Sequence, residues 1–513
     1  MKIERTKNAV RNIAFGGIQK IYMLAVPFLM RTLMIYYMGV QYLGLSSLFS
    51  SILQVLNLAE LGVGNAMVYS MYKPIAEDDE ETICALMKLY RTYYRIIGGI
   101  IAVVGIILLP FIPNLISQDS LNSLPNEINV YILYVLNLAT TVLTYWLFAY
   151  KNSILNAYQR NDIISKISIV TTTIQYGTQI AAICFLHDYY IYLIAALATQ
   201  IMNNIVTAVI ASKMFPNYKP EGDLEKTEVK KINRRIADLF TAKIGGVVTY
   251  SADTIVVSAF LGLTVLAIYQ NYYYILTAVT GILSVITAAC TAGIGNSFIV
   301  ESKEKNYGDL RKFTFIIMWI CGFCCCCFLN LYQPFMKIWV GEDLMFEFPA
   351  VVLFCVYFLS FELNAFLSVF KDAAGKWHED RFRPLITALA NLTLNIILVQ
   401  ICGIYGVIAS TFISQLIISI PWLNRNLFFT VYEKKYCKSY LLQLVRYAIV
   451  IFIACAVSYC VCRSVFIQND WGTLIVRFVI CLLTPNLLFF VFYFNKAEFK
   501  QSIELVKRIL KRG

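Results

Sequence analysis

Long, uninterrupted runs of apolar residues recur along the whole chain, and they constrain its fold more than any other feature. Examples lie at residues 96–112, 447–462 and 474–494. A helix needs about 20 mainly apolar residues to cross the roughly 30 Å of hydrocarbon in a bilayer. Because irregular backbone cannot face lipid, a chain that crosses the bilayer repeatedly must do so as helices. We therefore predict an all-α polytopic membrane protein.

The composition supports a chain that lies mostly within the membrane. Hydrophobic residues make up 59% of the 513 residues, charged residues only 14%, and the mean hydropathy is +0.66. A soluble protein carries roughly 25% charged residues. We predict about fourteen transmembrane helices. They are expected near residues 12–37, 44–70, 96–112, 128–150, 167–186, 190–212, 236–261, 265–299, 313–332, 349–370, 384–401, 407–424, 447–462 and 471–494.

The placement of basic residues predicts how the chain is oriented. Its net charge is +12, and about 37 of the 43 Lys and Arg fall in alternate connections and in both tails, as the positive-inside rule describes. The opposite connections hold only Lys337 and Arg463. This pattern indicates contact with an inner membrane surface and not with nucleic acid. We expect a bacterial cytoplasmic (inner) membrane protein with both termini cytoplasmic.

The two termini carry further signals. Basic residues precede a first apolar stretch that is too long for a signal peptide, and no small-residue cleavage site follows, so we expect a retained first helix. The tail from residue 496 has an apolar stripe with basic flanks. It is expected either to lie on the anionic inner leaflet or to be a solvated charged tail.

The chain has 15 cysteines, and nearly all of them lie within the predicted spans. Cys321 and the run Cys324–Cys327 imitate the spacing of a metal site, but no histidine is near them. We interpret these cysteines as small apolar residues of helices and expect no metal. Palmitoylation of a cysteine at an inner helix end is the alternative.

A charged linker divides the chain and separates two similar halves. We predict an N-terminal lobe at 1–212, a cytoplasmic linker at 213–235, a C-terminal lobe at 236–430, and two extra helices with a basic tail at 431–513. A shift of 223 residues aligns Lys20 with Lys243, and Gly62-Val-Gly-Asn65 is echoed by Gly293-Ile-Gly-Asn296. Two six-helix lobes related by an internal repeat are a design that transporters use to rock about a central site.

Three cations in the predicted spans are candidate substrate-binding residues. Lys20 and Arg31 are eleven residues apart, close to three helical turns, and so share one face of the first helix. Lys243 takes the matching place in the seventh. Arg31 is deep in its span and stays charged, so we predict that it faces an anionic substrate. Lys20 and Lys243 either share that role or only extend to the inner interface.

Three acidic residues in the predicted spans are candidates for coupling or charge pairing. They are Glu60, Asp253 and Glu362. Glu60 is expected at about the same depth as Lys20, so these two form a candidate pair. Ionisable residues within the membrane normally face a partner or a wet cavity. Each acid is expected either to couple to H⁺ or Na⁺ or only to neutralise nearby cations.

Signals of enzyme chemistry are missing. The chain has two histidines, both in or beside short loops, and no G-x-x-x-x-G-K-[ST] phosphate loop, which argues against ATP-driven pumping. No large outer connection is present to hold a polymerase site. We expect no catalytic residues and no cofactor.

Several segments resemble bacterial polysaccharide flippases. They are Arg31-Thr-Leu, Tyr36-Tyr-Met-Gly39-Val-Gln-Tyr-Leu-Gly44-Leu, Leu58-Ala-Glu60-Leu-Gly-Val-Gly-Asn65-Ala and Tyr72-Lys-Pro-Ile75, with Asp253-Thr-Ile and Leu261-Gly262 further on. The chain resembles the Wzx-type, or O-antigen repeat-unit, branch of the multidrug/oligosaccharidyl-lipid/polysaccharide (MOP) exporter superfamily. The resemblance covers the whole chain in topology and is most specific over residues 31–95.

The resemblance implies a function that the residues alone do not give. Members of this branch move undecaprenyl-pyrophosphate-linked oligosaccharides from the cytoplasmic to the outer leaflet through a cationic cavity between two six-helix lobes. Arg31 would then bind the head group, and Asp253 matches an acidic position of the family. The two extra helices resemble those that form a lipid-tail groove in the related lipid II flippase. Partners would be the lipid-linked glycan, the bilayer, and the polymerase and glycosyltransferases of the same pathway.

Three other functions remain open at this point. A drug exporter of the same superfamily would antiport organic cations and should have an acidic cavity, whereas this one is predicted to be basic. A membrane glycosyltransferase or polymerase would need an outer catalytic loop. A non-transporting subunit of a glycan export complex would not need Arg31 for leaflet transfer.

Overall fold

The computed structural model describes residues 5–60, 62–465, 467 and 469–512. Within helices, the side chains of residues 5–10, 13, 59, 238, 241–243, 288, 289, 292, 505, 506 and 508–512 lie outside that description. Every regular element in the described chain is a helix. The described chain divides into two compact units, at residues 1–267 and 268–513.

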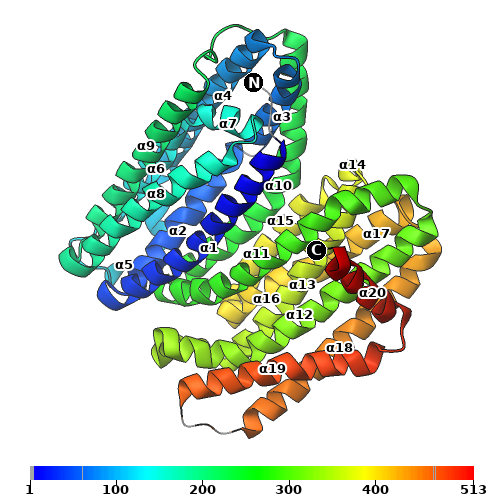
Figure 1. Ribbon diagram of the computed structural model, residues 1–513. Coiled ribbons are helices and arrows are strands. Elements are labelled where there is room, and N and C mark those ends of the chain that lie inside the picture. The colour runs from blue at the N-terminus through cyan, green and yellow to red at the C-terminus, as the bar shows by residue number, and fades with distance from the viewer. Residues whose placement is uncertain (1–4, 61, 466, 468, 513) are drawn as a thin grey trace. The chain divides into compact units, whose positions relative to one another are not determined.

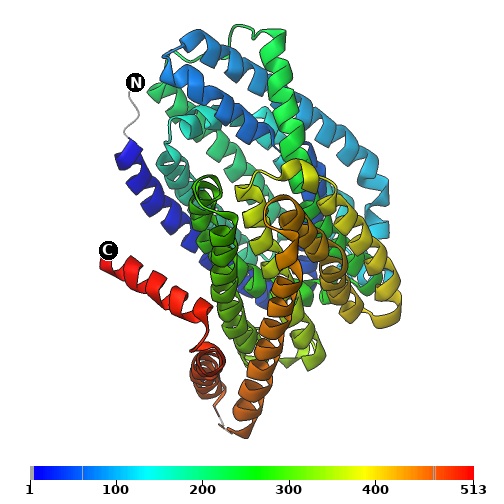
Figure 2. The ribbon, with the colours of Figure 1, turned by 90° about the vertical axis from the view of Figure 1, so that its right-hand side faces the viewer.

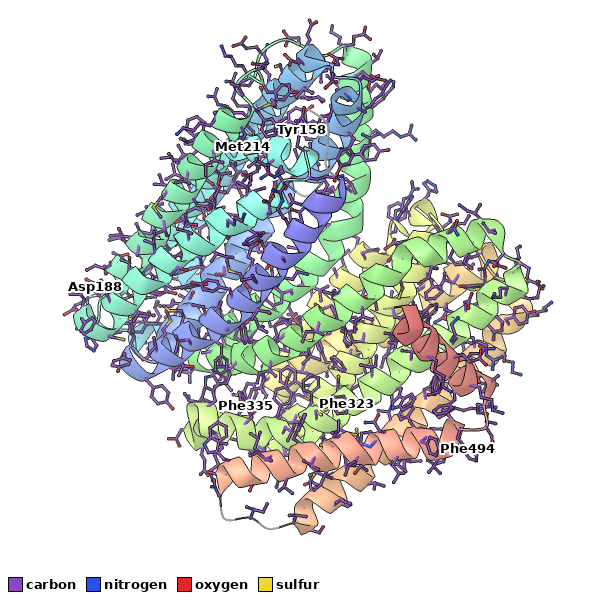
Figure 3. All side chains as sticks on the ribbon, viewed as in Figure 1. Tyr158, Asp188, Met214, Phe323, Phe335 and Phe494 are labelled. Carbon is purple, nitrogen blue, oxygen red and sulfur yellow. The ribbon has the colours of Figure 1, made fainter. Side chains whose placement is uncertain are left out.

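The first unit is a bundle of long helices joined by short helical turns (Figure 1). Its long helices are α1 (Arg5–Tyr37), α2 (Val40–Leu56), α3 (Val63–Ala76), α4 (Glu80–Leu108), α6 (Val130–Trp146), α8 (Asn161–Ala181), α9 (Tyr189–Met214) and α10 (Lys226–Leu261). Its short elements are η1 (Asn57–Glu60), η2 (Leu109–Leu115), α5 (Gln118–Asn122), η3 (Ala149–Lys151), α7 (Asn152–Ala157) and η4 (Ala182–Leu186). Asp188 and Met214, which Figure 3 labels, mark the two ends of α9.

The second unit contains the remaining helices, and α11 (Leu263–Val300) begins at the end of the first unit. The long helices are α12 (Lys303–Val340), α13 (Phe348–Ala373), α15 (Arg383–Cys402), α16 (Ile404–Ser414), α17 (Ile420–Thr430), α18 (Cys437–Ser464), α19 (Asp470–Tyr493) and α20 (Ala497–Arg512). The short elements are η5 (Glu342–Leu344), α14 (Trp377–Asp380), η6 (Gln415–Ser419) and η7 (Lys434–Tyr436). Helix α20 turns away from the end of α19 (Figure 2).

The prediction of an all-α membrane protein is confirmed. Eleven helices of the described chain are long and apolar enough to span a membrane, and the bent pair α6 and α7 raises this number to twelve. Helix α2 is apolar but has only 17 residues. The count of fourteen stays a prediction.

The expected second span at 44–70 is interrupted in the structure. Helix α2 ends at Leu56, the turn η1 follows, and α3 begins at Val63. The backbone of Gly62 has a positive φ of 93°, which an L side chain rarely adopts and which cannot continue an α-helix. The first Gly-x-Gly-Asn motif, at 62–65, therefore marks a break between two helices, whereas its echo at 293–296 lies within the helix α11 (Leu263–Val300).

Helix α10 packs within the first unit. It contacts α2, α3 and the turn η2, although the internal repeat places it at the start of the C-terminal lobe. The internal repeat divides the chain by similarity of sequence, whereas the two compact units divide it by proximity in space. The predicted lobes at 1–212 and 236–430 therefore stay a prediction, and α10 is the helix on which the two divisions differ.

Small residues allow two close helix contacts. A Cβ atom built on Gly44 of α2 would lie 2.3 Å from the carbonyl oxygen of Leu263. In the second unit, a Cβ on Gly406 of α16 would lie 2.2 Å from the carbonyl oxygen of Leu398 in α15. Both obstacles are backbone atoms, which cannot rotate away. Close approach through glycine is a common means of packing helices in membranes, where the hydrophobic effect does not drive them together.

We expect Gly406→Ala to destabilise the protein by about 1–3 kcal/mol, because the added methyl group overlaps the Leu398 backbone and forces α15 and α16 apart. Gly99→Ala in α4 is the matched control, since a Cβ there meets nothing within 4 Å. Thermal unfolding of the purified variants in detergent measures the difference. Equal melting temperatures for the two variants would contradict the close contact.

Candidate functional site

The two cations of the first helix lie within one membrane span. Helix α1 contains Lys20 and Arg31, and the candidate span covers residues 14–37. Lys20 is exposed and has no hydrogen bond or ion pair with any described side chain. Arg31 is half-buried, and its guanidinium lies close enough to the hydroxyl of Tyr192 in α9 to interact with it electrostatically. Helix α1 therefore places one exposed and one partly covered cation along its length.

Polar side chains join α1 to α8. Gln19 donates a hydrogen bond to the Ser168 hydroxyl at 2.9 Å, and the hydroxyls of Tyr22 and Thr173 are 2.8 Å apart. The ring of Tyr22 also lies 6.4 Å from that of Tyr176. This polar contact between the two helices fixes the rotation of α1 about its axis and hence the direction in which Lys20 and Arg31 point.

Glu60 belongs to a cluster of tyrosines instead of pairing with Lys20. Tyr94 of α4 donates a hydrogen bond to one carboxylate oxygen of Glu60 at 2.7 Å, and Tyr145 of α6 donates to the other at 3.2 Å. Tyr90 in turn donates to the Tyr94 hydroxyl at 2.6 Å. The described part of the chain contains no ion pair between Glu60 and Lys20. The carboxylate is thus held by phenolic hydroxyls, which satisfy its lone pairs without cancelling its charge.

Asp253 is buried in the polar interior of α10. Its exposed fraction is 1%, and Ser251, Thr254 and Ser258 beside it are fully buried. Asp253 has polar interactions with its surroundings. The side chain of Lys243, earlier on the same helix, lies outside the described residues. The predicted pairing of these two residues therefore stays a prediction.

Of the three predicted acids, Glu362 is the one that lies in the second unit. It lies in α13 with an exposed fraction of 3%, close to Cys321 and Cys324 of α12. No hydrogen bond or ion pair of its carboxyl group is formed with any described residue. A carboxyl group that is buried without partners within a membrane span is costly, which keeps Glu362 a candidate for coupling to an ion.

Several of the cysteines pack as core residues. Cys326, Cys462 and Cys481 form a buried cluster with Ala454, and the Cys326 sulfur lies 3.8 Å from that of Cys455. All of these residues come from α12, α18 and α19. Their role as small apolar helix residues agrees with this packing.

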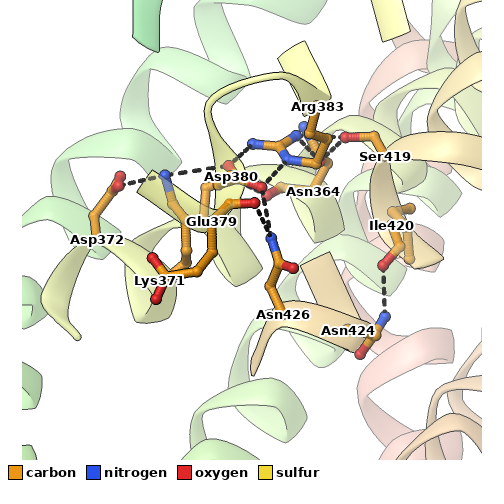
Figure 4. A network of polar contacts seen from close by, with 11 residues as sticks. Asn364, Lys371, Asp372, Glu379, Asp380, Arg383, Ser419, Ile420, Asn424 and Asn426 are labelled. Carbon is orange, nitrogen blue, oxygen red and sulfur yellow. Dashed lines mark hydrogen bonds and ion pairs between the residues drawn. The ribbon is translucent and has the colours of Figure 1, made fainter. Parts of the chain in front are cut away.

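A buried charge cluster that was not predicted from the sequence lies in the connection between α13 and α15. Arg383 donates two hydrogen bonds to Asp380, at 2.7 and 2.8 Å, and a third to the Ser419 hydroxyl (Figure 4). Lys371 lies 3.4 Å from the same carboxylate, and Asn426 donates to it at 3.2 Å. These charged residues are at most 7% exposed. The cluster fastens the ends of α13, α15 and α17 to one another.

A second buried aspartate has the same role in the first unit. Asp162, at the start of α8, has no exposed surface and is bound by Arg160 at 3.0 Å, with Lys166 at 3.7 Å and Arg11 at 3.9 Å. Its backbone N–H donates to Asn12 of α1. Asp162 and Asp380 thus lie at the start of the fifth and the eleventh expected spans, which are matching places in the predicted repeat.

We expect Tyr94→Phe to destabilise the protein by about 1–3 kcal/mol, because Glu60 loses its shortest hydrogen bond inside the bundle. The neighbouring Tyr93→Phe removes only an exposed hydrogen bond to Asn233 and should change stability by less than about 0.5 kcal/mol. Thermal unfolding of both variants tests this difference. A Tyr94→Phe variant as stable as Tyr93→Phe would show that the cluster does not hold Glu60.

Comparison with known proteins gives one family and one fold. A family model described as "Polysaccharide biosynthesis protein" matches residues 9–291, which is more than half of the chain. No curated protein matches the chain. The matched segment contains α1 to α10 and most of α11, and so five of the six predicted site residues.

Several solved structures are similar to the chain. One is the lipid II flippase MurJ in an inward closed conformation, with a TM-score of 0.69 and 18% identity, covering 94% of this chain and 99% of that one. Another is an inward-facing multidrug resistance MATE family transporter of the MOP superfamily, with a TM-score of 0.60 and 14% identity over 80% and 93% of the two chains. A third is a MOP superfamily transporter from Pyrococcus furiosus, with a TM-score of 0.52 and 14% identity, covering 82% of this chain and 94% of that one. At these identities the likeness establishes a shared transporter fold.

Proposed function

The chain belongs to the polysaccharide biosynthesis protein family, and on this basis we propose that it is a flippase for an undecaprenyl-pyrophosphate-linked oligosaccharide repeat unit. It would move this lipid from the cytoplasmic to the outer leaflet of a bacterial inner membrane by alternating access. The observation that carries the proposal is Arg31, a permanent charge well inside a membrane span of the matched segment. The transporter fold shared with MurJ supports the same reading.

The cations of α1 suit an anionic head group. A charge facing hydrocarbon is costly, so Arg31 and the exposed Lys20 should face water, head groups or a ligand. A pyrophosphate offers several oxygen acceptors, and a guanidinium binds two of them in parallel. We propose that Arg31, Lys20 and Lys243 bind the pyrophosphate, whereas the alternative for Lys20 and Lys243 is contact with the inner interface alone.

The membrane potential would supply the direction of transport. A pyrophosphate diester carries about two negative charges, so its outward movement down an inside-negative potential yields roughly 4–5 kcal/mol per 100 mV. The sugar hydroxyls would lose their hydrogen bonds in hydrocarbon, which prevents unaided crossing. The lipid tail needs no shielding and could remain in the bilayer.

Coupling to an ion is a further part of the proposal. Glu362 suits a proton, because its buried carboxyl group has no partner among the described side chains. Asp253 and Glu60 are held by polar neighbours and suit a role in charge pairing. The choice between H⁺ and Na⁺ is left to experiment, as is the participation of the polymerase and glycosyltransferases of an O-antigen type of pathway.

Functions of other classes make different demands on these residues. A drug antiporter, which the MATE-like fold also suits, should bind organic cations through acids and should not need Arg31. A glycosyltransferase or polymerase would transfer sugars without moving the lipid between leaflets. A non-transporting partner subunit would leave leaflet transfer intact when Arg31 is lost.

We expect Arg31→Ala to slow leaflet transfer of a fluorescent polyprenyl-pyrophosphate oligosaccharide in proteoliposomes by about 10- to 100-fold, because a charged hydrogen-bond donor to the substrate is lost. Arg31→Lys should keep part of the rate, and the exposed Arg234→Ala, outside the candidate spans, should keep all of it. Transfer that survives Arg31→Ala would remove this residue from the binding site. A wild-type protein that moves no such lipid but expels a cationic dye would be a drug antiporter.

We expect Glu362→Gln to abolish any stimulation of leaflet transfer by an imposed proton gradient, because the amide cannot exchange a proton, while transfer driven by the potential continues. Glu347→Gln is the matched control, since Glu347 is exposed at the start of the same helix. Transfer rates at fixed potential and varied internal pH measure the effect. A variant as sensitive to pH as the wild type would exclude Glu362 as the coupling group.

A further inference from the structure

A basic pocket of about 570 Å³ lies at one end of the helices α18 and α19, where α20 begins. Arg311 of α12, Arg446 of α18 and Lys496 bring three cations to its wall. Glu498, at the start of α20, is the acid that lines it. All of these residues belong to the second unit and to none of the sites considered above.

One of the three cations is already neutralised. Arg311 forms an ion pair with Glu498 and donates a hydrogen bond to the Gln443 side chain at 3.1 Å. Arg446 and Lys496 are exposed, and neither has a hydrogen bond or ion pair with any described side chain. The pocket therefore retains two positive charges that protein acids do not cancel.

The inner wall of the pocket is a fixed polar surface. Gln443 donates to the Tyr447 hydroxyl at 2.7 Å and to Glu498 at 3.2 Å. Gln443, Tyr447 and Glu498 are all at least nine-tenths buried. Because these groups bind one another, they hold the start of α20 against α18, beside the two cations that no described acid pairs with.

The outer rim of the pocket is apolar. Ile449 and Phe492 line it and expose about half of their side chains. Both lie in helices that qualify as membrane spans, so in a bilayer these side chains would lie beside lipid chains. A ligand that fits has an anionic head for Arg446 and Lys496 and a hydrocarbon chain for the rim. A soluble phosphate compound lacks the second part.

We propose that this pocket binds the phosphate head of an anionic membrane lipid, with its chains lying along α18 and α19. Basic pockets between membrane helices are known sites for anionic lipid head groups. A guanidinium and an ammonium group at the membrane surface are sufficient donors for one phosphate. The lipid is either a glycerophospholipid of the bilayer or a polyprenyl phosphate, since both carry the same phosphate chemistry.

The test measures lipid binding to the purified full-length protein by native mass spectrometry. Phosphatidylglycerol is titrated in one arm, undecaprenyl phosphate in a second, and uncharged diacylglycerol in a third. We expect Arg446→Gln with Lys496→Gln to weaken binding of at least one phosphate lipid by about tenfold or more. Diacylglycerol should bind equally to the variant and the wild type. The phosphate lipid whose binding the double variant weakens is the one that the pocket binds, either a glycerophospholipid or a polyprenyl phosphate.

The matched control is Lys438→Gln with Lys500→Gln, which removes the same charge from exposed positions outside the pocket at the same end of α18 and α20. Equal weakening by both double variants, or none by either, would overturn the proposal. The exchange of Arg446→Lys with Lys496→Arg keeps both charges and should keep binding, which separates loss of the site from loss of the fold. The assay records no leaflet transfer, so its result is independent of the proposed flippase activity.

Discussion

The structure depends on one constraint: polar groups that enter hydrocarbon must find their partners within the protein. The backbone meets it by forming helices throughout the described membrane segments. Buried charged side chains meet it with local clusters, as Asp162 does with Arg160 and Asp380 with Arg383. These clusters lie at helix ends, where each binds several helices together. Replacing one partner would leave a buried charge alone, which is far more costly than the net gain from the pair.

Two charged or ionisable side chains do not meet this constraint within the described chain. Glu362 is buried without a partner in the described chain, and Lys20 is a charge exposed on a membrane span. Such costly groups are the ones that we propose to serve a ligand or an ion, and this distinguishes them from Asp162 and Asp380, whose charges are paired within the protein. Glu60 is intermediate, because its partners are neutral tyrosine hydroxyls and not a cation.

The sequence was sufficient for the fold class, because apolar runs and the positions of Lys and Arg report directly on membrane spans. It was insufficient for contacts between distant helices. The donors of Glu60 are Tyr94 and Tyr145, and no local pattern relates them to residue 60. Asp380 was missed because a short charged connection has the same composition whether it is solvated or folded into a buried cluster. The break at Gly62 was also missed, since glycine within a helix and glycine at a positive φ look alike in sequence.

In a bilayer, the charges of α18 would set the depth of the helix pair that it forms with α19. Arg446 and Arg463 are about 25 Å apart along α18 at 1.5 Å per residue, close to the thickness of the hydrocarbon. In a bilayer this spacing would hold the apolar middle of the helix between two head-group layers and would place the pocket at Arg446 and Lys496 at the level of the phosphates. Glu498 ties α20 to the same level through Arg311. The depth of this helix pair, the start of the tail helix and the basic pocket are thus consequences of one arrangement of charges.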